Sequence, residues 1–400
     1  MTRKISAVIA ATLLLSACSE NGGPVGPNNP GTPVELSVVG KGDVLERFTS
    51  EVAASGTWVY TGTWSVRAEP GNAVKIWNAS ASTPTLVDSL IIPDSHTVGD
   101  VQVSDDGTLL VVASEFSGAL SIFDRSNPAK PVLLSRLTND EIEQGVHTVK
   151  LGRVDGRHYA FLSIDPSPAR LVIVDITDPS NPVQVWSQQM GAPFVHDVFV
   201  RDGLLFTALW DDGMTIWDLG GLGGGSPSAP AMLGNVRTVG GDVHNIYWFH
   251  DPVSGSKRYA FIGEEGRGVV GRPLGTSGST SGDIHVVDVS NPAAPAEVAF
   301  FHVDSAGVHN FAVDEANGIL YAAYYNAGVR ALDIRGDLGT CEPAEKAPDG
   351  RCDLGLMKRE RARALTDRTV SIWGVALSAD ALYASDMLSG VWRLEKVPPR

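Results

Sequence analysis

One short apolar motif recurs along the chain and constrains the fold more than any other feature. Each copy is a run of about five residues that ends at or beside an acidic or amide side chain. The more regular copies follow one another at intervals of roughly 45 residues, which is the period of a β-propeller blade. The seven copies have these acidic or amide residues at Asn78, Asp124, Asp175, Asp218, Asp288, Asp333 and Glu395.

Further short apolar runs surround most copies of the motif. In the third copy, TVKLG (148–152) and YAFLSI (159–164) precede RLVIVD (170–175), and a Pro/Asn/Ser turn then leads into VQVWS (183–187). Four short strands per repeat, separated by turn residues, are typical of a propeller blade. The sequence therefore predicts an all-β fold, a seven-bladed β-propeller.

The last copy ends too close to the C-terminus to be followed by a fourth strand. A propeller has to close its ring, because an open sheet edge exposes unpaired backbone groups. We therefore expect an N-terminal strand near Val34 to Gly40 to complete the last blade. The predicted domain spans 34–398, with insertions at about 266–282 and 336–356.

The third copy, which is the most regular, resembles a known repeat. Residues Leu171 to Pro182 read LVIVDITDPSNP, which is similar to the LVIVD repeat, a β-propeller family common in bacterial surface lipoproteins. The resemblance extends in weaker form over nearly all of the chain after its first segment and is weakest in the first and seventh copies. It implies the propeller fold and says little about activity, because a fold does not fix a function.

The N-terminal segment has the pattern of an export signal. Arg3 and Lys4 precede an apolar run from Ile5 to Leu15, which is too short to span a membrane core of about 30 Å. The sequence LSAC that ends at Cys18 resembles the lipobox of bacterial lipoproteins. Ordinary secretion with cleavage nearby is the alternative interpretation.

The lipobox resemblance implies a cellular address. It predicts a signal peptide over 1–17, lipidation of Cys18 and a flexible tether rich in Gly, Pro and Asn over 18–33. Ser19 stands where an aspartate would favour retention at the inner membrane, so by analogy with bacterial sorting we expect the outer membrane. The expected membrane contact is then made through the lipid anchor.

Two cysteines remain once Cys18 is assigned to the lipid. Cys341 and Cys352 bracket a polar loop, CEPAEKAPDGRC. In an oxidising envelope compartment, such a pair is expected to form a disulfide. Metal binding by so isolated a pair is the weaker alternative.

Charge and missing motifs exclude several functions. The formal net charge is −15, which argues against nucleic acid as a partner and favours cationic or metal-bridged ones. The sequence contains no HExxH, CxxC, GxSxG or P-loop motif. Gly266 to Gly271 matches a dinucleotide fingerprint, but Pro273 and the following Gly/Ser run forbid the helix that would hold a pyrophosphate, so no nucleotide is expected.

Four histidines occupy one repeated position, the start of a blade's first strand. In a four-stranded meander, the start of the first strand and the end of the second lie on the same rim near the axis. The predicted metal-ligand candidates are His147, His196, His244 and His309. Candidates for the ligand face, at the ends of second strands, are Glu115, Asp165, Trp210, Asp211, Asp212, Glu264, Glu265, Tyr325 and Asp386.

Three interpretations of the histidines stay open. They could hydrogen-bond neighbouring turns, they could bind a transition metal such as copper or zinc, or they could act directly on a ligand or proton. The main functional hypothesis is a lipid-anchored binding or scaffold module for a protein, peptide or glycan. The alternative is a copper-type oxidoreductase, in which Glu264 or Asp211 would orient the imidazoles or act as a base. A purely structural role in an envelope assembly is the third.

Overall fold

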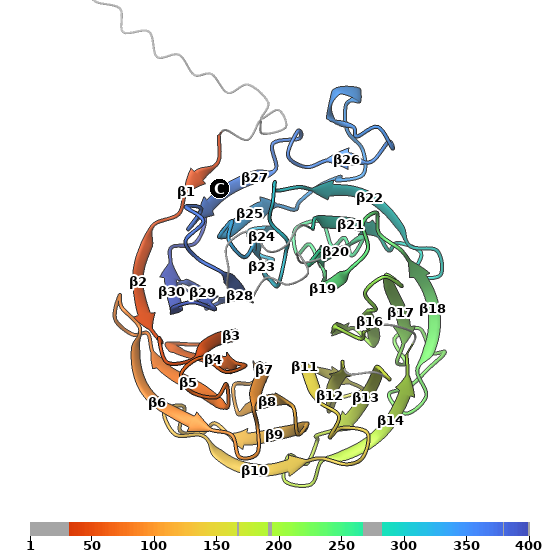
Figure 1. The fold of residues 1–400 in the computed structure, drawn as a ribbon. Coiled ribbons are helices and arrows are strands. Elements are labelled where there is room, and N and C mark those ends of the chain that lie inside the picture. The colour runs from red at the N-terminus through yellow and green to blue at the C-terminus, as the bar shows by residue number, and fades with distance from the viewer. Residues whose placement is uncertain (1–31, 166–167, 191–193, 267–281, 379, 399–400) are drawn as a thin grey trace, which may run out of the picture.

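The computed structural model describes residues 32–165, 168–190, 194–266, 282–378 and 380–398. Within these ranges, seven β-sheets stand as blades around a central axis (Figure 1). The prediction of an all-β, seven-bladed propeller is confirmed. None of the helices in these ranges is long and apolar enough to cross a membrane. The predicted signal peptide, Cys18, most of the tether and nearly all of the insertion at 266–282 lie outside the described residues.

The first strand of each blade lies nearest the axis, and the second pairs antiparallel with it (Figure 1). The first strands are β3 (Phe48–Ser55), β7 (Thr97–Val103), β11 (Val146–Val154), β15 (Asp197–Arg201), β19 (Val243–Trp248), β23 (Phe311–Asp314) and β28 (Ile372–Leu377). The second strands are β4 (Trp58–Trp64), β8 (Leu109–Glu115), β12 (Arg157–Ile164), β16 (Leu204–Ala208), β20 (Tyr259–Glu264), β24 (Ile319–Ala323) and β29 (Leu382–Asp386).

The third strands carry the repeated motif, and the fourth strands form the outer rim (Figure 1). The third strands are β5 (Ala73–Asn78), β9 (Ala119–Asp124), β13 (Arg170–Asp175), β17 (Met214–Asp218), β21 (Ile284–Asp288), β25 (Val329–Asp333) and β30 (Gly390–Leu394). The fourth strands are β6 (Thr85–Ile91), β10 (Val132–Leu137), β14 (Val183–Gln189), β18 (Ala231–Val236), β22 (Ala296–Phe301), β27 (Glu360–Ala364) and β2 (Val38–Asp43).

The acidic residue of the motif closes the turn into the fourth strand. Asp175 Oδ1 accepts a hydrogen bond from the backbone N–H of Thr177, two residues further on, at 2.9 Å. Such a bond is the Asx turn, which lets a short side chain replace a backbone partner. The same bond is made by Asn78, Asp124, Asp218, Asp288 and Asp333. The repeated acid is therefore part of the turn and does not belong to a ligand site.

The hydrophobic core is divided into layers between neighbouring blades. Among the described residues, seven buried clusters each join two adjacent blades, including the pair formed by the first and last blades. Each third strand is covered on both faces, which explains why RLVIVD (170–175) is nearly continuously apolar. An eighth cluster, built from Tyr325, Trp373 and Met387, lies at the axis.

The N-terminal segment closes the ring, as predicted, but with different bounds. Strand β2 pairs antiparallel with β30 in the last blade, and Lys41 lies opposite Trp392. The preceding strand β1 (Val34–Glu35) instead pairs parallel with β27 of the sixth blade. Glu35 forms an ion pair with Arg363 at 3.0 Å. The chain therefore runs along the sixth blade before it enters the seventh, so the closing strand begins four residues later than expected.

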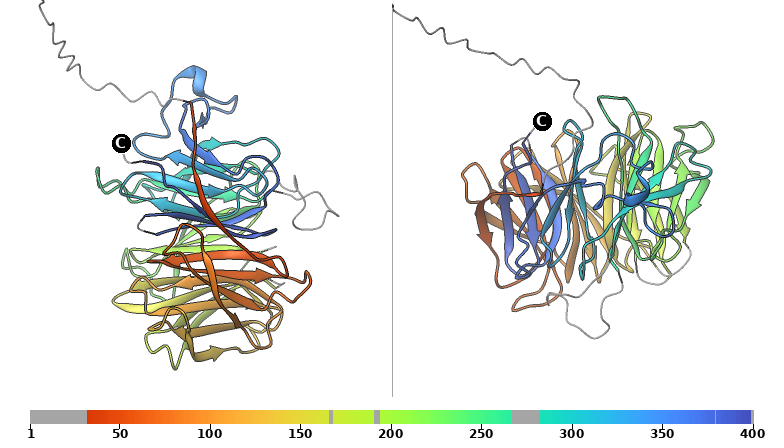
Figure 2. Two further views of the ribbon diagram at one scale, coloured as in Figure 1. Left: turned by 90° about the vertical axis from the view of Figure 1, so that its left-hand side faces the viewer. Right: turned by 90° about the horizontal axis from the view of Figure 1, so that it is seen from above.

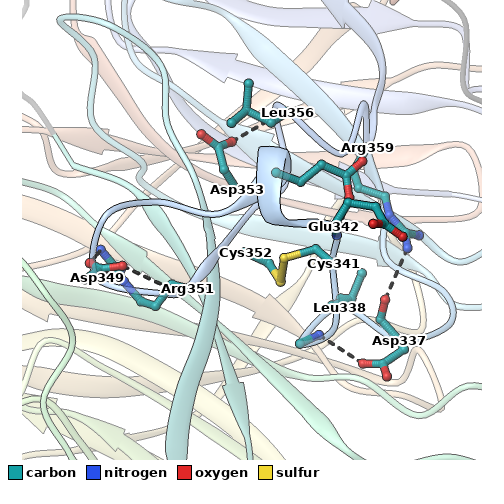
Figure 3. Close-up of a disulfide and its surroundings, with 12 residues drawn as sticks. Asp337, Leu338, Cys341, Glu342, Asp349, Arg351, Cys352, Asp353, Leu356 and Arg359 are labelled. Carbon is teal, nitrogen blue, oxygen red and sulfur yellow. Dashed lines mark hydrogen bonds and ion pairs between the residues drawn. A yellow bond between two sulfur atoms is a disulfide. The ribbon is translucent and has the colours of Figure 1, made fainter.

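The segment around 336–356 projects from the outer edge of the ring (Figures 1 and 2). It contains a 3₁₀ turn (Pro343–Glu345) and β26 (Cys352–Asp353), which adds to the fifth blade beside β22. Cys341 and Cys352 form a disulfide, with 5.9 Å between their Cα atoms (Figure 3), so that prediction is confirmed. The bond fastens the inserted loop to the blade edge.

We predict that ring closure by the N-terminal segment contributes measurably to stability. A chain that begins at Val44 lacks β1 and β2 and leaves β30 as an open edge. Its Tm should fall by roughly 5 °C or more relative to a chain that begins at Pro33, and part of it should elute as dimers or larger species in size-exclusion chromatography. Equal Tm values and a monomeric truncated chain would contradict this account of closure.

Candidate functional site

In the third and fifth blades, the repeated histidine lies at a β-bulge of the first strand. The pairing register of first and second strands shifts between Val146 and Thr148, and between Val243 and Asn245. The bulged residues are His147 and His244. A bulge re-aims one side chain out of the regular alternation. Here it directs the imidazoles toward the axis, where side chains from different blades meet.

The axial side chains form a closed circle of contacting rings. We call this circle the axial ring and define it by Trp64, His147, His196, His244, His309 and Trp373. The centroids of consecutive imidazoles are 3.9 to 4.3 Å apart. The two tryptophans complete the circle, with centroids 5.2 Å apart. The structure thus brings the four predicted histidines together.

His147 differs from the other three histidines because it has a carboxylate partner. Its Nδ1 contacts Glu115 Oε1 and lies 3.8 Å from Asp165 Oδ2. Burial opposes a charged imidazole, but the attraction of Glu115 and its hydrogen bond raise the pKa of His147 to about 10. His147 is therefore an imidazolium at neutral pH, and its Nδ1–H donates a hydrogen bond to Glu115.

The other three imidazoles are buried and neutral. Burial is the main cause that lowers the pKa of His196, His244 and His309 well below the usual value, and the neighbouring imidazoles lower it further. Several of their ring nitrogens have no hydrogen-bond partner: Nδ1 of His196, Nε2 of His244 and Nδ1 of His309. Such nitrogens are available to bind a ligand, an ion or water.

Glu265 is the carboxylate that faces the neutral imidazoles. Its Oε2 lies 3.9 Å from Nε2 of both His196 and His244. The hydroxyl of Tyr325 donates to the other oxygen, Oε1, at 2.5 Å. Trp210 stacks on His196, with centroids 5.2 Å apart and an angle of 24° between the ring planes. The predicted residues Trp210, Glu265 and Tyr325 therefore meet around the same imidazoles.

The remaining predicted face residues have other surroundings. Glu264 contacts His285 Nε2 at 2.9 Å and accepts a hydrogen bond from Thr238, so it points between strands of the fifth blade. Asp386 accepts hydrogen bonds from Ser371 N–H and Leu388 N–H and serves as a turn residue. Asp212 forms an exposed ion pair with Arg237 at 2.7 Å. Asp211 lies beside Gly241, where an added Cβ would be 3.0 Å from Asp211 Oδ1.

Two axial residues were not predicted from the sequence, because they belong to the first blade, whose copy of the repeat is weak. Trp64 ends the second strand there, at the position that Glu115 occupies in the next blade. Glu51 lies in the first-strand bulge and approaches His309 Nδ1 at 3.4 Å. Aligning the first blade strand by strand, rather than by its motif, would have indicated both residues.

Blade two departs from the histidine pattern for a steric reason. Its bulge residue is Gly99. A Cβ on Gly99 would lie 2.2 Å from the backbone oxygen of His147 and 3.0 Å from Glu115 Oε1. The pair formed by Glu115 and His147 fills the space that a side chain from this blade would need.

A polar channel continues along the axis beside the axial ring. It encloses a cavity of about 220 Å³ whose lining includes Glu51, Asp100, Asp197, Lys150 and Asn245. Burial raises the pKa of Asp197 to about 7, and the charge of Asp100 adds to this shift. The pKa values of Asp100 and Glu51 are also raised, mainly by burial. The channel therefore brings three carboxyl groups close to one another, and Lys150 is the cation in its lining.

Two sets of axial side chains are close enough to share a metal ion. Their ligand atoms lie within 4.8 Å of one another, and in the described ranges the sets are His147 with Asp165 and His196, and His196 with His244 and Glu265. Each set combines two imidazoles with one carboxylate. Neither set contains all four histidines, because the four imidazoles follow one another along the axial ring.

We predict that the bond between Glu115 and His147 makes stability depend on pH. Since the folded pKa of His147 lies above its unfolded value, the stabilisation is complete below about pH 6.5 and is lost as pH rises toward 10. Between pH 7 and 10 the free energy of unfolding should fall by on the order of a few kcal/mol. The Glu115→Gln variant should lose the part of this slope that His147 contributes, as measured by urea unfolding.

The control for this experiment is Glu143→Gln, which removes an exposed carboxylate from the same part of the chain. Burial lowers the pKa of His285, but its hydrogen bonds to Glu264 and Glu297 raise it to about 9. Its contribution to the pH dependence of stability is the same in every variant. If Glu115→Gln and the native protein show equal slopes, the assigned charge state of His147 is wrong.

Comparisons with known proteins agree with this fold. The profile of the LVIVD repeat family matches residues 166–188 and 279–303. The crystal structure of Sqt1 from Saccharomyces cerevisiae superposes with a TM-score of 0.57 at 11% identity, over 92% of this chain and 87% of Sqt1, which shows a shared fold only. Among curated protein sequences, none is significantly similar to this chain. The chain is thus a seven-bladed β-propeller that carries LVIVD repeats.

Proposed function

We propose that this protein is a lipid-anchored module of the bacterial outer membrane that binds a protein, peptide or glycan. Its ligand face is the rim that surrounds the axial ring. The repeat family and the propeller fold support a binding or scaffold role. The lipobox-like sequence around Cys18 supports the anchor.

The observation that carries the proposal is a set of aromatic side chains in strained turns at this rim. Phe116, Trp210 and Tyr325 have positive φ angles of 52°, 53° and 39°. Bulky residues rarely adopt this conformation, which costs about 1–3 kcal/mol and persists where the surroundings impose it, often at functional sites. Phe116 is 63% exposed, although folding alone would favour a small polar residue there.

Trp210 belongs to a connected group of aromatic rings at this rim. Phe194 contacts Trp210 edge-on, with centroids 5.3 Å apart, and Trp210 stacks on His196. Aromatic side chains supply large contact areas at low entropic cost and are enriched in binding interfaces. Asp165 and Glu265 lie beside them. Together with the net charge of −15, these carboxylates favour a ligand that carries positive charge.

The ligand face can be tested in the native envelope by site-specific photo-cross-linking. A photoreactive phenylalanine analogue at Phe116 should give a discrete adduct, and adding Trp210→Ala should reduce its yield at least about fivefold. The control places the same analogue at Met232, which is 60% exposed on the outer strand β18. No adduct at Phe116, or equal adducts at both positions, would contradict the proposed face.

The anchor makes a separate prediction. Cys18→Ser should move the protein from the membrane pellet to the soluble envelope fraction, because the acyl chains supply the membrane affinity. Intact-mass measurement should show the loss of the lipid. A variant that stays in the membrane pellet would exclude lipidation at Cys18, whereas the cross-linking result would remain valid for the ligand face.

A further inference from the structure

We propose that the axial ring binds one divalent transition-metal ion, held by Nε2 of His196, Nε2 of His244 and the carboxylate of Glu265. The ion would lie beneath the proposed ligand face. The inference concerns ion binding alone and does not depend on the anchor or on an envelope ligand.

The distances suit direct coordination. Zinc ligands lie about 2.0–2.1 Å from the metal, so two ligands of one ion are at most about 4.2 Å apart. Glu265 Oε2 is 3.9 Å from Nε2 of His196 and 3.9 Å from Nε2 of His244. The three ligand atoms all lie within 4.8 Å of one another. Shifts of a few tenths of an ångström would bring them to ligating positions.

The hydrogen bonding of His244 fixes the tautomer that a metal requires. Its Nδ1 lies 3.2 Å from the backbone oxygen of His309. A carbonyl oxygen can only accept, so Nδ1 carries the proton and Nε2 presents its lone pair. That Nε2 is buried and has no hydrogen-bond partner. Metal-bound histidines commonly donate their other N–H to such a carbonyl.

Glu265 is oriented in a corresponding way. The Tyr325 hydroxyl donates to Oε1 at 2.5 Å, which leaves Oε2 facing the two imidazoles. Tyr325 is thus a positioning residue, because it acts through Glu265. Glu115 and Asp165 add two further carboxylates near the cluster, while His147 supplies one positive charge. The excess of carboxylates would be balanced by a bound cation.

The donor set selects the class of ion. Two imidazoles and one carboxylate suit zinc, copper or nickel, whereas calcium and magnesium prefer six or more oxygen ligands. Three protein ligands leave at least one coordination position open. About a fifth of the Glu265 side chain is exposed, so the ion could be reached from the rim.

The test is isothermal titration of the purified full chain, without a polyhistidine tag, with Zn²⁺ alone. We expect one equivalent to bind with a Kd in the micromolar range or tighter, and no detectable binding of Mg²⁺ under the same conditions. Glu265→Gln keeps the shape of the side chain and its bond to Tyr325, and it should weaken zinc binding at least about tenfold. His244→Ala should weaken it further, and Tyr325→Phe should weaken it by about tenfold.

The matched control is His302→Ala. His302 is an exposed imidazole between Asp283 and Asp304, at 2.6 and 3.1 Å, and could bind zinc adventitiously. The His302→Ala variant should bind zinc with a Kd within about twofold of the native value. The proposal is overturned if the native chain binds no zinc, if Glu265→Gln binds it normally, or if only His302→Ala abolishes binding. Should His244→Ala fail to fold, the isosteric Glu265→Gln variant decides the question.

Discussion

Packing between blades is the interaction on which the rest of this structure depends. Each sheet has two apolar faces, and each face is covered only when another blade lies against it. In the described part of the chain, seven buried clusters provide this cover, such as the one joining Leu171 and Ile173 of the third blade to Leu205 of the fourth. The layer that joins Trp77 of the first blade to Tyr383 of the last completes the circle. A ring is therefore the arrangement that leaves no blade face open.

The axial ring follows from this packing. Because every blade presents its first strand to the axis, equivalent residues of consecutive blades become neighbours in space. In the third, fifth and seventh blades, a bulge at the equivalent position turns one side chain inward. The blades then differ in what they contribute: His147 is charged beside Glu115, His244 is neutral, and Trp373 contributes a purely aromatic surface. One scaffold thus combines a buried ion pair with unpartnered imidazole nitrogens.

The repeat period and turn chemistry were sufficient to predict the blades, their number and closure by the N-terminus. They also placed four histidines from consecutive blades on one rim. The orientation of neighbouring residues at strand ends could not be predicted: Glu264 points between strands toward His285, whereas Glu265 faces the axis. Consecutive strand residues point to opposite sides, so an uncertainty of one residue reverses the assignment. Trp64 and Glu51 were missed because the first blade has little sequence likeness to the repeat.

The central claim is that the neutral imidazoles and Glu265 form a ligand site and do not merely fill the axis. The most direct measurement is anomalous X-ray diffraction at the zinc absorption edge, from crystals soaked in dilute Zn²⁺. The account predicts one strong peak, about 2.1 Å from Nε2 of His196 and from Nε2 of His244. Peaks confined to surface side chains, with none at the axis, would contradict it.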